Sequence, residues 1–130
     1  MRQTSEKEIE SVLALDGPAR FNHFVKRVAD SGFAWGLWRD EGWVLMASDD
    51  GKQAFPLWPA REYAQLHCTN DWTASEVRAI PLAELVDELL PKLEQSAILP
   101  GVFPTPSGKG VTPAARPLAD ALRAESHQYE

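Results

Sequence analysis

The sequence predicts an α+β protein in which helices pack on a small, mostly antiparallel sheet. Two observations carry this prediction. Apolar residues recur with helical spacing near both ends of the chain, whereas residues 33–58 contain three aromatic-rich stretches that are typical of strands. Short turns with glycine join these stretches, as in an antiparallel meander. We therefore expect a central three-stranded meander with helices packed on the sheet.

The composition is that of an ordinary globular domain. The chain has 130 residues, of which 44% are apolar and 25% are charged. Its 19 acidic and 13 basic residues give a net charge of −6, which would repel nucleic-acid phosphates and acidic membrane surfaces. A single cysteine excludes an internal disulfide, and the sequence shows neither a membrane span nor the apolar run of a signal peptide. We therefore expect a cytoplasmic protein with no nucleic-acid or membrane partner.

Two helices are expected before the meander. Ser5 and Glu8 have the spacing of a capping box, which begins the first helix. The run from Asp16 to Pro18 ends that helix and caps a second one, whose apolar residues share one face. We expect residues 1–15 to form a peripheral N-terminal helix and residues 16–130 to form a single α+β domain.

The meander is expected to contain strands at residues 33–38, 43–48 and 53–58. Period-two alternation places Trp38 on the opposite face of the first strand from Trp35. A proline within the third stretch, at position 56, favours an edge strand or a strand end there. Beyond the meander we expect further elements in this order: a helix at residues 60–68, a strand at 76–80, a helix opened by Pro81 and disturbed by Pro91, a strand at 97–103, and a last helix that begins near Pro113 or Pro117.

Three stretches contain part of a ligand-binding motif but lack the rest. The loop at residues 104–110 holds Lys109 in a glycine-rich run, yet no Ser or Thr follows the lysine to bind Mg²⁺. Residues 49–51 begin like a calcium loop without its later acidic ligands. His67 and Cys68 are neighbours, and neighbouring side chains on a helix diverge by about 100°. We therefore predict no metal ion and no cofactor.

The candidate binding residues are weaker signals. Five tryptophans are many for a chain of this length, and tryptophans at a surface are enriched in interfaces and ligand grooves. A place in the core is the alternative for each of them. The candidates for binding a ligand or partner are Trp38, Trp58, Arg61, Trp72 and Lys109.

Several stretches together resemble a known family of small bacterial proteins, domain of unknown function 2750. The resemblance covers about residues 18 to 125 and implies a compact bacterial protein. It implies no activity, cofactor or catalytic residue. The stretches are FNHFVKRVAD at residues 21–30, Trp35 to Leu37, Gly42-Trp43, FPLWPAREY at residues 55–63, Trp72, residues 79–82, and VFPTPSGKGV at residues 102–111.

Two hypotheses of function stay open. The first is a non-catalytic interaction or regulatory module, which would expose an apolar patch with Trp38 or Trp72 to another protein or to a second copy in a homodimer. The second is a small-molecule-binding protein or an enzyme of unrecognised type. It predicts a pocket bordered by residues 55–61 and 104–110.

Overall fold

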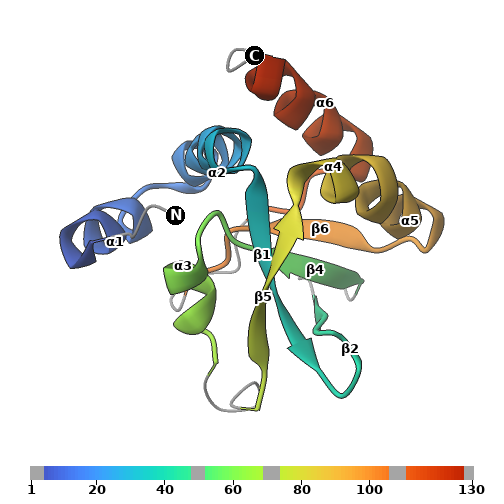
Figure 1. Cartoon of the computed structure of the whole chain (residues 1–130), viewed down its shortest axis with the longest axis horizontal. Coiled ribbons are helices and arrows are strands. Elements are labelled where there is room, and N and C mark those ends of the chain that lie inside the picture. The colour runs from blue at the N-terminus through green and yellow to red at the C-terminus, as the bar shows by residue number, and fades with distance from the viewer. Residues whose placement is uncertain (1–4, 48–51, 69–73, 106–110, 128–130) are drawn as a thin grey trace.

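The computed structural model describes residues 5–47, 52–68, 74–105 and 111–127. Within these ranges the chain is an α+β protein with five helices and two small three-stranded sheets (Figure 1). The helices are α1 (Glu6–Leu13), α2 (Gly17–Ser31), α3 (Arg61–Gln65), a continuous helix made of α4 (Leu82–Glu84), η2 (Leu85–Leu89) and α5 (Leu90–Gln95), and α6 (Ala115–Ser126). The strands are β1 (Phe33–Arg39), β2 (Gly42–Trp43), β3 (Met46–Ala47), β4 (Gln53–Leu57), β5 (Glu76–Pro81) and β6 (Leu99–Val102).

The caps of the first two helices confirm the sequence prediction. The Ser5 hydroxyl accepts a hydrogen bond from the Glu8 N–H at 3.1 Å, and the Asp16 carboxylate accepts one from the Ala19 N–H at 2.9 Å. Gly32 ends α2 in the left-handed conformation, with φ at 85°. These local signals therefore set where each helix begins and ends.

A partly buried ion pair joins α1 to α2. Arg27 is only 7% exposed, and its Nη1 lies 3.0 Å from Oε2 of Glu8. Val12 is buried on the same side of α1 and contributes to the apolar core. The ion pair and the buried Val12 thus both attach helix α1 to the rest of the described chain.

Replacing Glu8→Ala should lower the free energy of unfolding by about 1–3 kcal/mol, because it removes a carboxylate partner of a buried guanidinium. Urea denaturation of the whole chain measures the effect. Glu10→Ala is the matched control, since Glu10 is exposed on the same helix and should change stability by less than about 0.5 kcal/mol. Equal effects of the two substitutions would contradict a structural role for the ion pair.

The strands do not form the expected single meander. Sheet A has the order β2-β1-β5 and is antiparallel, whereas sheet B has the order β3-β4-β6 and is mixed, because β4 and β6 run parallel. The expected second strand is split: Trp43 pairs with β1, and Met46 pairs with β4. The reason is that β1 and β4 meet directly, since Trp35 and Trp58 exchange two backbone hydrogen bonds of 2.9 Å. No room is left between them for a continuous middle strand.

Pro56 was expected to mark either an edge strand or a strand end, and only the second of these is found. Strand β4 is the middle strand of sheet B, not an edge strand, although Pro56 does lie next to the strand end. Leu57 bonds toward β6, whereas Trp58 bonds toward β1. By alternation, the backbone groups at position 56 point to the same side as those of Trp58, and the pairing of β4 with β3 on that side has already ended at Ala54. The missing N–H of the proline therefore falls in a gap between β3 and β1.

The helix after β5 accommodates its proline by a wider turn. The Leu90 N–H donates to the Leu85 C=O, five residues back, so that Pro91 follows a π-helical stretch.

The last helix begins at Ala115, after Pro113 and before Pro117. The expected elements near residues 60–68, 76–80 and 97–103 are present as α3, β5 and β6, the first and last of them shorter than expected.

The core lies between the sheets and the helices. Helix α6 packs against α2 and α5, and α3 lies against both β1 and β5 (Figure 1). The largest side chains with almost no exposure include Trp58, Tyr63, Phe24 and Phe103. In the part of the chain that the structure describes, no helix has the length and apolar character needed to span a membrane.

Candidate protein-interaction surface

The hairpin of β1 and β2 brings two tryptophans together. Asp40 and Glu41 both have positive φ, at 52° and 63°, which is the geometry of a tight two-residue turn whose twist matches the strands. This turn sets Trp38 opposite Trp43. The two rings meet edge to face, with centroids 5.1 Å apart and planes at 90°. Such a pair contributes about 0.5–1.5 kcal/mol beyond its buried area.

An arginine from β5 lies on the first of these rings. The Arg78 guanidinium carbon is 4.3 Å from the centroid of the Trp38 ring, which is a cation–π contact. Glu76 lies on the same face of β5, and its Oε1 accepts a hydrogen bond from Nε of Arg78 at 3.3 Å. The Arg78 and Glu76 side chains are 43% and 66% exposed. We call the set Trp38, Trp43, Glu76 and Arg78 the tryptophan surface.

A glycine in β1 makes room for this arrangement. A Cβ atom at Gly36 would lie 3.1 Å from Cζ3 of Trp43, closer than most Cβ contacts in proteins, so the ring would have to shift by a few tenths of an ångström. The Trp43 ring also lies 5.5 Å from the Phe55 ring in sheet B, and the same Cβ would lie 3.5 Å from Phe55. Trp43 therefore packs against both Gly36 and Phe55, while Trp38 and Trp43 stay only half-buried. The surface is ordered and still open to solvent.

The other candidate residues are not part of this surface. Trp58 is fully buried, and its indole N–H donates to the Pro104 C=O at 2.9 Å, so it is a core residue. Arg61 is exposed at the first position of α3. Trp72 and Lys109 lie outside the described residues, as do the turn at residues 49–51 and most of the loop at 104–110.

His67 shares its hydrogen-bond acceptor with Trp58. Its Nε2 lies 3.1 Å from the Pro104 C=O, and because a carbonyl can only accept, Nε2 carries the proton. The imidazole ring packs on the Trp58 ring at 4.8 Å. Burial lowers the pKa of His67 below its usual 6.5, and the hydrogen bond to Pro104 only partly opposes this. Burial also raises the pKa of the Cys68 thiol, which makes it a poor nucleophile at neutral pH.

The lowered pKa of His67 predicts a loss of stability in acid. Because the unfolded chain takes up the proton at higher pH than the folded chain, the stabilising contribution is complete above pH 6.5 and falls as the pH drops below it. His67→Gln should flatten this part of the curve of stability against pH. Urea denaturation of both proteins at a series of pH values measures it. A wild-type curve that rises as the pH is lowered through this range would contradict the burial of a neutral imidazole.

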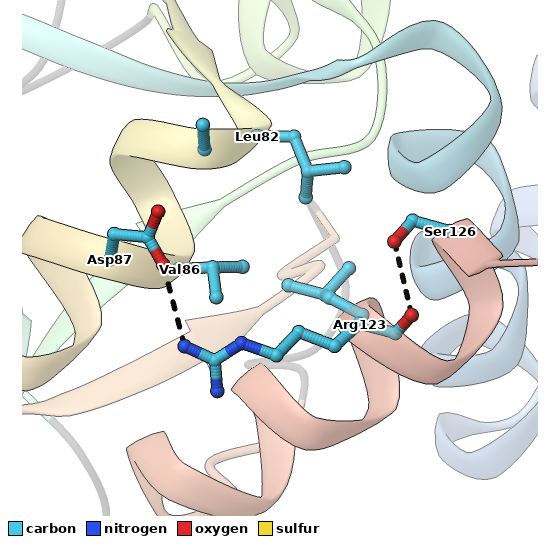
Figure 2. A pocket seen from close by; sticks show the side chains of 7 residues that line it. Leu82, Val86, Asp87, Arg123 and Ser126 are labelled. Carbon is cyan, nitrogen blue, oxygen red and sulfur yellow. Dashed lines mark hydrogen bonds and ion pairs between the residues drawn. The ribbon is translucent and has the colours of Figure 1, made fainter. Parts of the chain in front are cut away.

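A shallow groove separates α6 from the helix α4–η2. It has a volume of about 220 Å³, and Figure 2 shows Leu82, Val86, Asp87, Arg123 and Ser126 around it. Arg123 reaches across the groove to Asp87, with 3.4 Å between Nη2 and Oδ1. A second hollow of about 160 Å³ follows the same helices toward α5. Both are smaller than the roughly 300–1,000 Å³ of common ligand pockets.

Several of these residues were not predicted from the sequence. Arg78 and Glu76 lie two apart in a strand, which places them on one face, but nothing local shows that β5 pairs beside Trp38. The pairing of Trp38 with Trp43 could have been found by counting outward from the turn. Asp87 and Arg123 come from helices far apart in the sequence.

Among the residues described by the structure, no group of three or more His, Cys, Asp or Glu could hold a metal ion.

The fold and the tryptophan surface define a small α+β protein with an ordered aromatic surface that carries paired charges. Residues 21–122 match the model of the family described as protein of unknown function (DUF2750). The chain belongs to this family, which confirms the resemblance found in its sequence. No curated protein and no solved structure matches the chain.

Proposed function

We propose that the chain is a non-catalytic protein-interaction or regulatory module of the bacterial cytoplasm. Its contact surface is the tryptophan surface on sheet A. The single cysteine suits a reducing compartment, and the net charge of −6 disfavours nucleic acid as the partner. The partner is another protein, a second copy of this chain included.

One observation carries this proposal: two half-buried indoles and an exposed ion pair form a rigid cluster on the sheet. Tryptophan and arginine are the residue types most enriched among those that dominate binding energy at protein interfaces. Because the rings are already held by Gly36, Phe55 and Arg78, little side-chain entropy is lost when a partner covers them.

Affinity purification of the tagged chain from its host tests the proposal. We expect a protein that is retained by the wild type and lost with Trp38→Ser. Leu66→Ser is the matched control, because Leu66 is 41% exposed outside the tryptophan surface. Circular dichroism confirms that both variants are folded. Equal retention by all three proteins would contradict the assignment of the surface.

A second candidate function is the binding of a small acidic molecule in the groove beside α6. The observation that favours it is Arg123, which crosses the groove between apolar walls and is 51% exposed. A thermal-shift screen with inorganic phosphate and small carboxylic acids tests it, with Arg123→Gln as the comparison. A stabilising compound whose effect survives Arg123→Gln would exclude this site.

A further inference from the structure

The edge of sheet A carries unused backbone hydrogen-bonding groups. In the order β2-β1-β5, strand β5 is an edge strand of six residues. Trp35 bonds away from β5, toward Trp58, so the alternate residues of β1 are the ones that bond to β5. Those residues pair with Glu76, Arg78 and Ile80. The N–H and C=O groups of Val77 and Ala79 therefore point away from the sheet.

Of the two residues that carry these outward groups, Val77 is half-buried and Ala79 is exposed. No backbone–backbone hydrogen bond joins Val77 or Ala79 on this side to any residue in the described ranges. Helix α3 lies against β1 as well as β5. Ala79 is exposed, as are Glu76 and Arg78 on either side of Val77. An open edge of this kind is a template for another strand.

We propose that β5 pairs with β5 of a second copy of the chain, antiparallel and centred on Val77. The inference rests on the proposed interaction function and specifies its partner. A two-fold axis at Val77 lets each Val77 exchange both backbone hydrogen bonds with its equivalent. Ala79 then bonds to the partner's Ser75, and the two sheets join into one.

Charge selects this register. With Val77 at the centre, Glu76 of one copy lies opposite the partner's Arg78, and Arg78 lies opposite the partner's Glu76. Directly opposed side chains in such pairs have Cβ atoms about 4.5–5.5 Å apart, and opposite charges there are stabilising. A register centred on Ala79 would instead place Arg78 opposite the partner's Ile80. It would also bring Pro81, which has no N–H, into the ladder.

The pairing would also extend the tryptophan surface. Each Arg78 already lies on a Trp38 ring, and each Trp38 lies against Trp43. In the dimer, the stacks of Arg78, Trp38 and Trp43 from the two copies would meet at the four charged side chains of Glu76 and Arg78. These four charges would alternate in sign across the two strands, so neither copy would bring unpaired charge to the junction.

Two charge reversals provide the test. Arg78→Glu gives a strand with two carboxylates, and Glu76→Arg gives a strand with two guanidinium groups. Each variant alone should dimerise at least about tenfold more weakly than the wild type, because every cross-strand pair becomes repulsive. An equimolar mixture of the two variants should restore the dimer, since opposite charges again face one another. Sedimentation equilibrium at a series of concentrations measures the mass, and circular dichroism checks that each variant is folded.

The outcomes separate this inference from the proposed function. A wild-type chain that stays monomeric up to millimolar concentration would overturn the dimer, as would a dimer that neither reversal weakens. If the chain is monomeric but a different protein is retained by the wild type and lost with Trp38→Ser, the interaction function stands without the dimer. Should one reversal fail to fold, the double variant Glu76→Arg with Arg78→Glu takes its place: it keeps opposite charges opposed and should dimerise like the wild type. A monomeric double variant would contradict the register.

Discussion

Trp58→Ala should lower the free energy of unfolding by about 3–5 kcal/mol, the largest effect that we expect from a single substitution in this chain. The Trp58 side chain is fully buried and belongs to the core shared by both sheets. Its backbone joins β4 to β1 through Trp35, and its indole N–H donates to Pro104. The substitution would leave a large cavity at the point where the two sheets meet. Urea denaturation followed by circular dichroism measures the change.

Two comparisons separate packing from hydrogen bonding in this effect. Trp58→Phe keeps an aromatic ring but removes the N–H donor, and we expect a loss of about 1–3 kcal/mol. Trp38→Ala removes the same residue type from a half-buried position, and it should cost only about 1–2 kcal/mol. A loss with Trp38→Ala as large as that with Trp58→Ala would contradict the assignment of Trp58 to the core and of Trp38 to the surface.

Gly36→Val should lower the free energy of unfolding by about 1–3 kcal/mol and should disrupt the tryptophan pair. The added Cβ would lie 3.1 Å from the Trp43 ring and 3.5 Å from the Phe55 ring, so both rings crowd the new side chain. The Trp43 ring would have to shift, which would change its edge-to-face contact with Trp38. The exciton-coupled circular dichroism of the two indoles should therefore weaken together with the stability.

The matched control for Gly36→Val is Gly42→Val in the same hairpin. A Cβ at Gly42 would meet no atom within 4 Å. It should leave the exciton signal unchanged, whereas Gly36→Val should reduce it. If Gly36→Val left both the stability and the exciton signal at wild-type values, the close contact between Gly36 and Trp43 would be wrong.

The helices and the first hairpin could be predicted because their signals are local. Ser5, Asp16 and Gly32 mark helix ends through bonds to residues a few positions away. Asp40 and Glu41 form a turn whose length alone determines that Trp38 faces Trp43. In each case the stabilising partner lies within five residues, so the sequence contains both halves of the interaction.

The arrangement of the sheets could not be predicted because its causes lie far apart in the chain. Strand β4 pairs in parallel with β6, more than forty residues later, and this pairing makes β4 a middle strand. The direct contact of Trp35 with Trp58 splits the second strand of the expected meander. For the same reason Arg78 was missed: its place on Trp38 depends on β5 pairing with β1 across more than thirty residues.

Amide-resolved hydrogen exchange tests the central claim, that the tryptophan surface and the β5 edge are where the chain meets a protein. The wild-type chain is measured alone at low concentration and then in its complex, either with itself at high concentration or with the protein that co-purifies. The account predicts that the amides of Val77 and Ala79 exchange at least about tenfold more slowly in the complex, because their N–H groups gain a partner. Unchanged exchange at both amides, with new protection confined to α6 and η2, would contradict the account and would place the contact at the groove instead.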